Sequence, residues 1–146
     1  MSRPSPADNW VWKINRVIPS DPVEGRHVLR DVLSQLQEHR WVPDDIFGVQ
    51  LALEEALVNA IKHGNRLDAS KCVHVECKMS TERLWIEIRD EGPGFDPQDV
   101  PDCTHPDRLL VPSGRGIMLM RAYMSCVRFS DRGNVVVMEK ERARSA

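Results

Sequence analysis

Hydrophobic residues along the chain recur with two different periods, and their order first predicts a strand followed by two helices. β-Branched and aromatic residues are dense from Trp10 to Ile18, which predicts a strand that ends at Pro19. Apolar residues then recur at helical spacing from Pro22 to about His39, and again from Pro43 to Gly64. Proline in the first turn and glycine at the end are typical helix boundaries, so both helices have defined limits.

The segments that follow alternate with the period of a β-strand. One face of each is wholly apolar, with Val73, Val75, Cys77 and Met79 on the first and Leu84, Ile86 and Ile88 on the second. This alternation predicts a hairpin with one buried face. A proline-rich loop over residues 92–112 follows, and loops of that length inside a domain are usually functional. We then expect a third helix from about Gly114 or Gly116 to Met124, and a final hairpin over residues 126–140.

Because helices and strands come in groups, the predicted class is α+β. We expect a two-layer sandwich, in which helices cover one face of a mixed, mostly antiparallel sheet. The 146 residues suffice for one domain, which we place at residues 10–141. Residues 1–9 and 142–146 are expected to be flexible ends.

Composition and charge narrow the function classes. Apolar residues make up 41% of the chain and charged residues 29%, with a formal charge of −2, so a folded domain without a nucleic-acid partner is expected. No apolar run reaches the roughly 18 residues of a membrane span, and the first residues do not form a signal peptide. Four cysteines, Cys72, Cys77, Cys103 and Cys126, form no Cys-x-x-Cys pair. We expect reduced thiols and a cytoplasmic protein.

Polar residues interrupt the second predicted helix in "LEEALVNAIKHGN", residues 53–65. At about 100° per residue, Glu55 and Asn59 lie in one row away from the apolar stripe, and His63 continues it. Glu54 lies about 100° from Glu55 and outside that row, where we expect solvent or an ion pair. A polar row on a helix is ordinarily just solvated, so a site requires further signals.

Two glycine-rich turns supply those signals. Asp90 continues the inward parity of Ile88, and a buried carboxylate is costly without a partner or ligand. Gly92 and Gly94 follow, which allows the backbone to pass close to another group. The second turn, Ser113-Gly114-Arg115-Gly116, stands before the third helix, where amides and the helix dipole favour phosphate. It matches neither the Walker A loop nor the dinucleotide fingerprint, and each turn alone is weak evidence.

Taken in order, the segments "EEALVNAIKHGN", "DEGPGF" and "SGRGIMLM" resemble the N-box and the two glycine boxes of the GHKL ATP-binding superfamily, named for gyrase, Hsp90, histidine kinases and MutL. The resemblance covers roughly residues 45–140. Within the superfamily, the chain looks most like the bacterial anti-sigma factors that are serine-protein kinases. The resemblance implies a Bergerat-type ATP-binding fold, with ATP and Mg²⁺ as cofactors.

The resemblance also implies roles for the polar residues of the helix and the strand end. Asn59 would hold Mg²⁺, which prefers oxygen ligands, and Glu55 would be the general base. Asp90 would accept a hydrogen bond from the adenine amino group. Gly92 and Gly94 would let the backbone approach the base.

At the phosphate end, Gly114 and Gly116 would offer amides, with Arg115 as an added cation. Many family members carry a basic residue where this chain has Pro112, so either Arg108 or Arg115 could meet the phosphates. His63 could be a helix cap or a contact near the phosphates. The proline-rich loop would close over the nucleotide as a lid.

The implied partners are a sigma factor and an anti-anti-sigma protein of the STAS type, whose serine receives the γ-phosphoryl group. A homodimer is also implied. Trp10 and Trp12 share parity on the first strand, and they belong either to the core or to the edge through which family members often dimerise.

Two alternatives remain open. A stand-alone domain of the histidine-kinase type would need a phospho-accepting histidine, and His27 lacks the expected neighbours. A nucleotide-gated binding module without phosphotransfer is the other, although such a module has no need of a base at Glu55.

Overall fold

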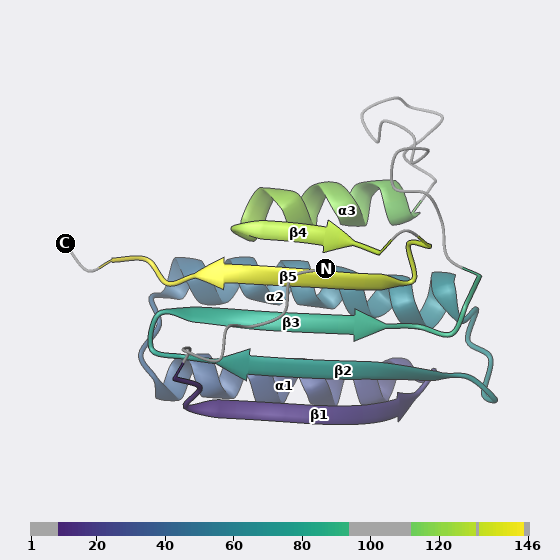
Figure 1. Ribbon diagram of the computed structural model, residues 1–146, viewed down its shortest axis with the longest axis horizontal. Helices are drawn as coiled ribbons and strands as arrows, with labels where there is room; N and C mark the ends of the chain where they lie inside the picture. Colours follow the sequence, from purple (N-terminus) through teal and green to yellow (C-terminus); the bar gives the residue numbers. More distant parts are fainter. Residues whose placement is uncertain (1–8, 94–111, 131, 145–146) are drawn as a thin grey trace.

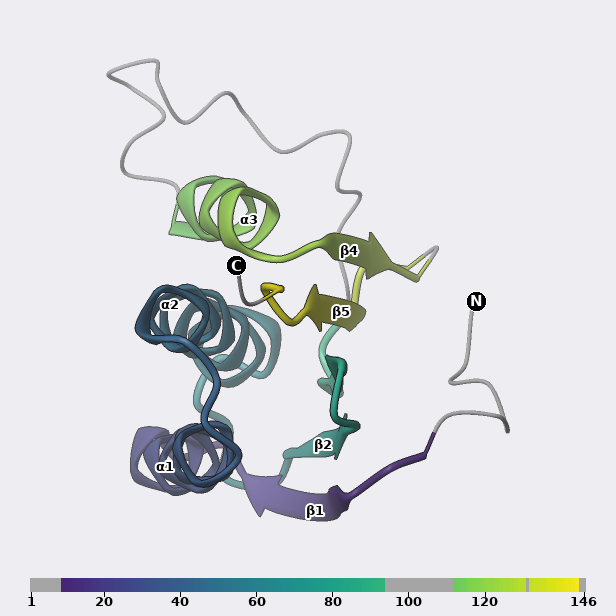
Figure 2. The same ribbon diagram turned by 90° about the vertical axis from the view of Figure 1, so that its left-hand side faces the viewer.

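The computed structural model describes residues 9–93, 112–130 and 132–144, and in it a five-stranded sheet carries helices on one face (Figures 1 and 2). In chain order the elements are β1 (Trp12–Pro19), α1 (Pro22–Glu38), α2 (Pro43–Val58), the π-helix η1 (Asn59–Gly64), β2 (Cys72–Met79), β3 (Arg83–Arg89), α3 (Pro112–Tyr123), β4 (Cys126–Phe129) and β5 (Val135–Glu141). The predicted α+β class is confirmed.

The strands lie in the order β1-β2-β3-β5-β4, and each of these pairings is antiparallel. Their register brings apolar side chains into rows across the core face, and one such row consists of Ile14, Cys77, Ile86, Met138 and Val127. The mixed sheet that we expected is therefore purely antiparallel among the described strands. The alternation in β2 and β3 has the predicted effect, because its apolar face is fully buried.

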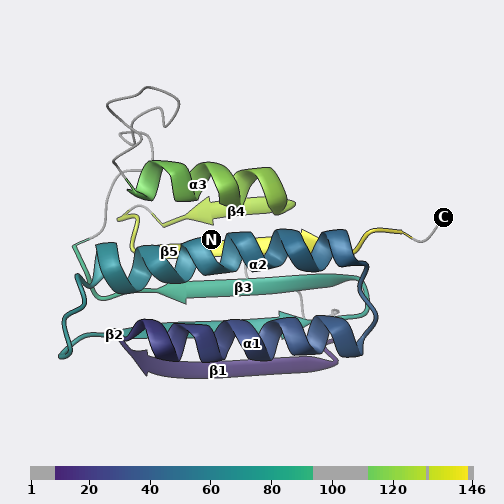
Figure 3. The same ribbon diagram turned by 180° about the vertical axis from the view of Figure 1, so that it is seen from behind.

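The helices form the second layer, with α2 lying between α1 and α3 (Figure 3). Asp21 caps α1 by accepting a hydrogen bond from the Val23 amide at 2.9 Å, which satisfies one of the free amides of the first turn. The apolar stripes of α1 and α2 supply fully buried residues to the core, among them Val28, Val32, Leu36, Val49 and Leu53. Within the described residues, no helix is long and apolar enough to cross a membrane.

Two helix boundaries differ from the sequence expectation. α3 begins at Pro112 rather than at Gly114 or Gly116, because proline is well suited to a first helical turn. The second helix does reach Gly64, but its last six residues form the π-helix η1. There the amide of Asn65 bonds to the carbonyl of Ala60, five residues earlier, at 2.9 Å. Such widened turns occur mostly as short insertions in α-helices, frequently at functional sites.

The two tryptophans near the N-terminus lie on opposite faces of the sheet. Trp12 pairs with Met79 and packs against the main core, whereas Trp10 packs against Trp85 on the other face. The shared parity that we expected is wrong, because the regular strand begins only at Trp12. Lys78 lies over both Trp10 and Trp85, with its ammonium 6.0 and 5.6 Å from the ring centroids.

The chain after β5 is bonded to the loop between α1 and α2 and to the first turn of α2. Arg142 donates to the carbonyl oxygens of His39 and Arg40 at 2.8 and 2.9 Å, and the Ala143 amide donates to Asp45 at 2.8 Å. These bonds attach the first two residues of the expected flexible tail to the domain.

Candidate functional site

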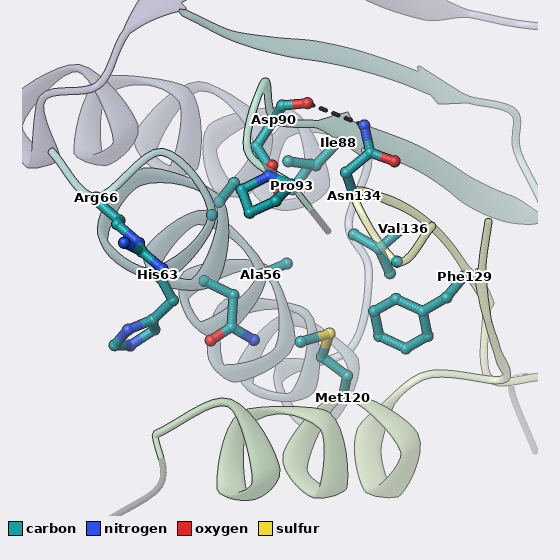
Figure 4. Close-up of a pocket in the computed structure, with 14 residues that line it drawn as sticks. Ala56, His63, Arg66, Ile88, Asp90, Pro93, Met120, Phe129, Asn134 and Val136 are labelled. Carbon is teal, nitrogen blue, oxygen red and sulfur yellow. Dashed lines mark hydrogen bonds between the residues drawn. The ribbon is translucent and has the colours of Figure 1, made fainter. Parts of the chain in front are cut away.

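A cavity of about 180 Å³ opens between the end of the second helix, α3 and the neighbouring ends of β3 and β5 (Figure 4). Its walls are largely apolar and include Ala56, Ala60, Ile88, Met120, Phe129 and Val136. Its polar lining comes from Asn59, His63, Arg66, Asp90 and Asn134. Apolar walls with a few placed polar groups are typical of small-molecule sites.

Asp90 is held at this cavity by its neighbours on the chain and on β5. Its amide donates to the carbonyl of Asn134 at 3.0 Å, and the Asn134 side chain donates back to the Asp90 carbonyl at 3.3 Å (Figure 4). The carboxylate oxygen Oδ1 accepts the Gly92 amide at 2.8 Å. Burial raises the pKa of Asp90, although the Gly92 bond and the charges of Lys71 and Arg132 oppose that shift. Asp90 thus points inward, as predicted, and is half-buried.

The end of η1 lies directly against this acid because two glycines allow the approach. A Cβ atom at Gly64 would lie 2.4 Å from Oδ2 of Asp90, and a Cβ atom at Gly92 would lie 2.0 Å from the carbonyl oxygen of Gly64. No side chain fits at either place. Gly92 thus has the close-approach role that the sequence suggested. Gly64 has the same role in addition to ending the helix.

Glu55 and Asn59 form the predicted row and face the first turns of α3. A Cβ atom at Gly116 would lie 3.0 Å from Oε2 of Glu55 and 3.0 Å from Nδ2 of Asn59. Both polar atoms of the Asn59 side chain are buried and have no hydrogen-bond partner among the described residues. Buried amides ordinarily have partners, so this one is available for a ligand. Glu54 is exposed, as expected of a residue outside the row.

His63 and Arg66 lie at the η1 end of the cavity (Figure 4). Partial burial and the charge of Lys62 lower the pKa of His63 from its usual 6.5, while Glu55 opposes the shift. His63 is therefore mainly neutral near pH 7 and is a poor candidate for a fixed cation at the phosphates. Arg66 is the cation that the structure adds to the cavity lining.

The predicted second glycine turn lies at the start of α3. Gly114 and Arg115 belong to the first turns of α3, so the second glycine turn is part of the helix rather than ahead of it. The amides there still point toward the positive end of the helix dipole. Gly94, Arg108 and the proposed lid lie outside the described residues.

The structure also adds residues that the sequence prediction missed. Asn134 lines the cavity, but in the sequence it belongs to an ordinary glycine turn. Asn65 is fully buried behind Asp90, although an asparagine after a helix-ending glycine normally indicates an exposed turn. No sequence pattern places Arg66 in the cavity either. Its backbone has a φ of 53°, a left-handed conformation that an arginine in the sequence does not indicate.

The arrangement suits a nucleotide with a divalent cation. The apolar cavity with one carboxylate matches a flat base that carries an amino donor. The Asn59 amide, which has no partner among the described residues, matches a cation at the phosphates, because amide oxygen is a suitable ligand for Mg²⁺. The Glu55 carboxylate lies against the same point of α3 as the Asn59 amide, where a base for a hydroxyl would be needed.

Comparison with known proteins agrees with this geometry. The family model described as a histidine kinase-like ATPase domain matches residues 18–140. The chain is 28% identical over 109 residues to the anti-sigma F factor of Oceanobacillus iheyensis, an alignment that covers 70% of this chain and 73% of that protein. It is 29% identical over 131 residues to the serine-protein kinase RsbW of Bacillus subtilis, covering 85% of this chain and 81% of that protein.

A solved structure resembles the fold. The crystal structure of the RsbU and RsbW domains of a Mycobacterium tuberculosis protein superposes with a TM-score of 0.62 at 16% identity. The match covers 93% of this chain and 34% of that longer one, so it supports the architecture alone.

Proposed function

Because the chain belongs to the histidine kinase-like ATPase domain family, we propose that it is an anti-sigma factor with serine-protein kinase activity. In this proposal it binds ATP with Mg²⁺ and transfers the γ-phosphoryl group to a serine of an anti-anti-sigma protein. It alternately sequesters a sigma factor and thereby controls transcription. Similarity to the anti-sigma F factor and to RsbW supports the role.

The observation that carries the proposal is the position of Asn59 and Glu55 against Gly116. The Asn59 amide is buried and has no partner among the described residues, and its Nδ2 and the Glu55 carboxylate both lie against Gly116, each 3.0 Å from where a Cβ atom there would be. A structural amide would have found a partner, since leaving one unpaired costs about 1–3 kcal/mol. An acid next to a phosphate site is likewise unexplained by binding alone, because it repels the phosphates.

Each residue then has a chemical task. Asp90 accepts a hydrogen bond from the adenine amino group, and Gly92 lets the backbone lie against the base. The amides of Gly114 and Gly116 face the phosphates, and either Arg108 or Arg115 supplies an added cation there. Glu55 takes the proton from the serine hydroxyl of the partner as the serine oxygen bonds to the γ-phosphorus. The bond from that phosphorus to the bridging oxygen breaks, and ADP leaves with the electron pair.

The residues present fit a magnesium ion. Asn59 would hold it through its amide oxygen, with phosphate oxygens and waters as the other ligands. When bound, the ion neutralises charge on the phosphates during transfer. Either Arg108 or Arg115 provides further positive charge at the phosphates.

The partners follow from the same similarity. We propose that the protein binds a sigma factor and a STAS-type antagonist through its surface. We expect it to be cytoplasmic and to form a homodimer. Neither nucleic acid nor membrane has a part in the mechanism. The sheet face with Trp10 and Trp85 is a separate surface from the nucleotide cavity.

The test is transfer of labelled phosphate from ATP in the presence of Mg²⁺ to purified STAS-type domains encoded in the same genome. Wild type is expected to label a serine of one of them. Glu55→Gln keeps the shape of the side chain and is expected to lower the transfer rate about 10²- to 10⁴-fold while ATP still binds. Asn59→Ala is expected to lose Mg²⁺-dependent ATP binding.

Glu54→Gln is the matched control, because it neutralises the adjacent acid on the exposed side of the helix. Its transfer rate should equal that of wild type. If wild type binds ATP but labels none of the domains, the protein is a nucleotide-gated binding module instead. If Glu54→Gln and Glu55→Gln reduce transfer equally, Glu55 is not the base.

A further inference from the structure

Asn65, the residue after η1, is a fully buried polar side chain that does not line the nucleotide cavity. Its relative exposure is 0%, so each of its polar atoms must be satisfied within the protein. Nδ2 donates to Oγ of Ser20 at 3.0 Å and to the carbonyl of Cys72 at 2.9 Å. Oδ1 accepts the Glu91 amide at 2.7 Å. The side chain therefore joins segments that are far apart in the sequence.

Three of these groups form a closed ring of hydrogen bonds. Asn65 donates to the Cys72 carbonyl, the Cys72 amide donates to Oε1 of Glu91 at 2.6 Å, and the Glu91 amide donates back to Asn65. Ser20 extends the cluster by donating to the carbonyl of Lys71 at 2.7 Å. Because donors and acceptors alternate around the ring, a single position of Glu91 satisfies all three hydrogen bonds of the ring.

The ring fixes the residue that follows Asp90. Asp90 itself is bonded to Asn134 through both its amide and its carbonyl, and its carboxylate accepts the Gly92 amide. The Glu91 amide lies between the amides of Asp90 and Gly92, which have these partners. It donates its hydrogen bond to Asn65. Asn134 thus holds the segment from the β5 side and Asn65 holds it from the helix side.

The same segment is also in close contact with the helix side. Gly64, next to Asn65, lies so close to Asp90 that an added Cβ would be 2.4 Å from the carboxylate. Any shift of Glu91 away from Asn65 therefore moves the carboxylate relative to the η1 wall of the cavity.

We propose that Asn65 is a positioning residue for base recognition, because it places the Asp90 carboxylate against the adenine amino group through the Glu91 amide. The inference rests on the proposed ATP binding and goes beyond it. In this inference, a buried residue outside the cavity determines how well the site discriminates adenine from bases that lack the amino group. A charge-assisted hydrogen bond of this kind discriminates about 10- to 100-fold, and loss of its geometry removes most of that ratio.

The experiment measures dissociation constants for ATP and for inosine triphosphate, in which an oxygen replaces the amino group. Wild type is expected to prefer ATP roughly 10- to 100-fold. Asn65→Ala removes the acceptor for Glu91 and is expected to bring the preference close to unity, mainly by weakening ATP. A general loss of stability would weaken both nucleotides alike and leave the ratio unchanged.

Two variants serve as controls. Ser20→Ala removes another partner of the same amide but leaves the Glu91 bond, so its preference should equal that of wild type. Asn65→Asp keeps an acceptor for Glu91 but faces the Cys72 carbonyl with a second oxygen, so it should lose stability and keep the preference.

The outcomes separate the two proposals. If wild type binds neither nucleotide, the proposed function fails. If wild type prefers ATP and a folded Asn65→Ala keeps the full preference, Asn65 does not position Asp90. Should Asn65→Ala fail to fold, a folded Asn65→Asp that has lost the preference would overturn the inference equally.

Discussion

Replacing Gly64 by alanine tests the base site with one methyl group. The φ of Gly64 lies outside the left-handed region, so alanine introduces no backbone strain and changes only the contact. The new Cβ would lie 2.4 Å from Cγ and Oδ2 of Asp90 and 2.7 Å from Oδ1. Ordinary van der Waals contact begins at 3.4 Å, so the carboxylate and the helix end must separate by about 1 Å.

This displacement sets the size of the effect on binding. A hydrogen bond between a charged acceptor and an amino group is worth about 1.5–3 kcal/mol, and a shift of about 1 Å removes most of it. We therefore expect Gly64→Ala to weaken ATP about 10- to 150-fold. The fold should persist, because alanine favours a helix over glycine by about 1 kcal/mol and offsets part of the strain.

The assay is titration calorimetry of Mg-ATP, accompanied by far-ultraviolet circular dichroism and a thermal melt. Gly25→Ala is the matched control in α1. Its Cβ would lie 3.0 Å from the terminal methyl of Ile61, so this flexible side-chain end needs to shift by only a few tenths of an ångström, and no atom of Asp90 lies within 4 Å of it among the three nearest. That variant should bind ATP within about twofold of wild type. If a folded Gly64→Ala also bound ATP within twofold, Asp90 would not recognise the base from the position described.

Three further predictions concern charge, packing and thiol chemistry. Burial raises the pKa of Asp90 from 3.8, so the folded protein binds this proton more tightly than the unfolded chain, and ionised Asp90 lowers stability above its folded pKa. Asp90→Asn should melt higher than wild type near neutral pH by calorimetry, with the difference shrinking toward pH 3.8, while ATP binding is lost. Ile86→Ala, at a position with 0% exposure, should cost about 2–5 kcal/mol in urea unfolding, whereas Val17→Ala, at 60% exposure, should stay within about 0.5 kcal/mol. Burial raises the pKa of the Cys77 thiol to about 12, so peptide mapping after alkylation should show Cys72 modified and Cys77 protected until the protein is unfolded.

Elements with a strong period were predictable from the sequence because burial on one face requires that period. The alternation through Cys77 and Ile86 fixed which side chains enter the core, and its continuation placed Asp90 at the cavity. The row of Glu55 and Asn59 was predictable for the same reason, since helix geometry alone separates it from Glu54. Periodicity does not identify a strand's neighbour, so the insertion of β5 between β3 and β4 could not be derived in this way.

What local sequence could not supply depends on long-range hydrogen bonds. Nothing in the residues from Asn59 to Gly64 favours a widened helical turn over an α-helical one. The wider turn brings Asn65 to a place where Ser20, Cys72 and Glu91 meet its side chain. An asparagine after glycine has the composition of an exposed turn, and only the fold shows that it is buried. Such departures from local preference are expected at functional sites.

η1 also connects the two ends of the proposed nucleotide site. This connection determines which binding property Gly64→Ala changes. Asn59 begins the element and Gly64 ends it, so the amide at the proposed phosphate end and the wall of the proposed base site belong to one helical element. If the added methyl moves Asp90, preference for ATP over inosine triphosphate falls and dependence on Mg²⁺ is unchanged. If it moves the helix end instead, the displacement reaches Asn59, and affinity for both nucleotides falls together with their dependence on Mg²⁺. Because Asn65 also bonds to Ser20 and to the Cys72 carbonyl, outside the Asp90 segment, we take the helix end to be the firmer of the two and expect the first result.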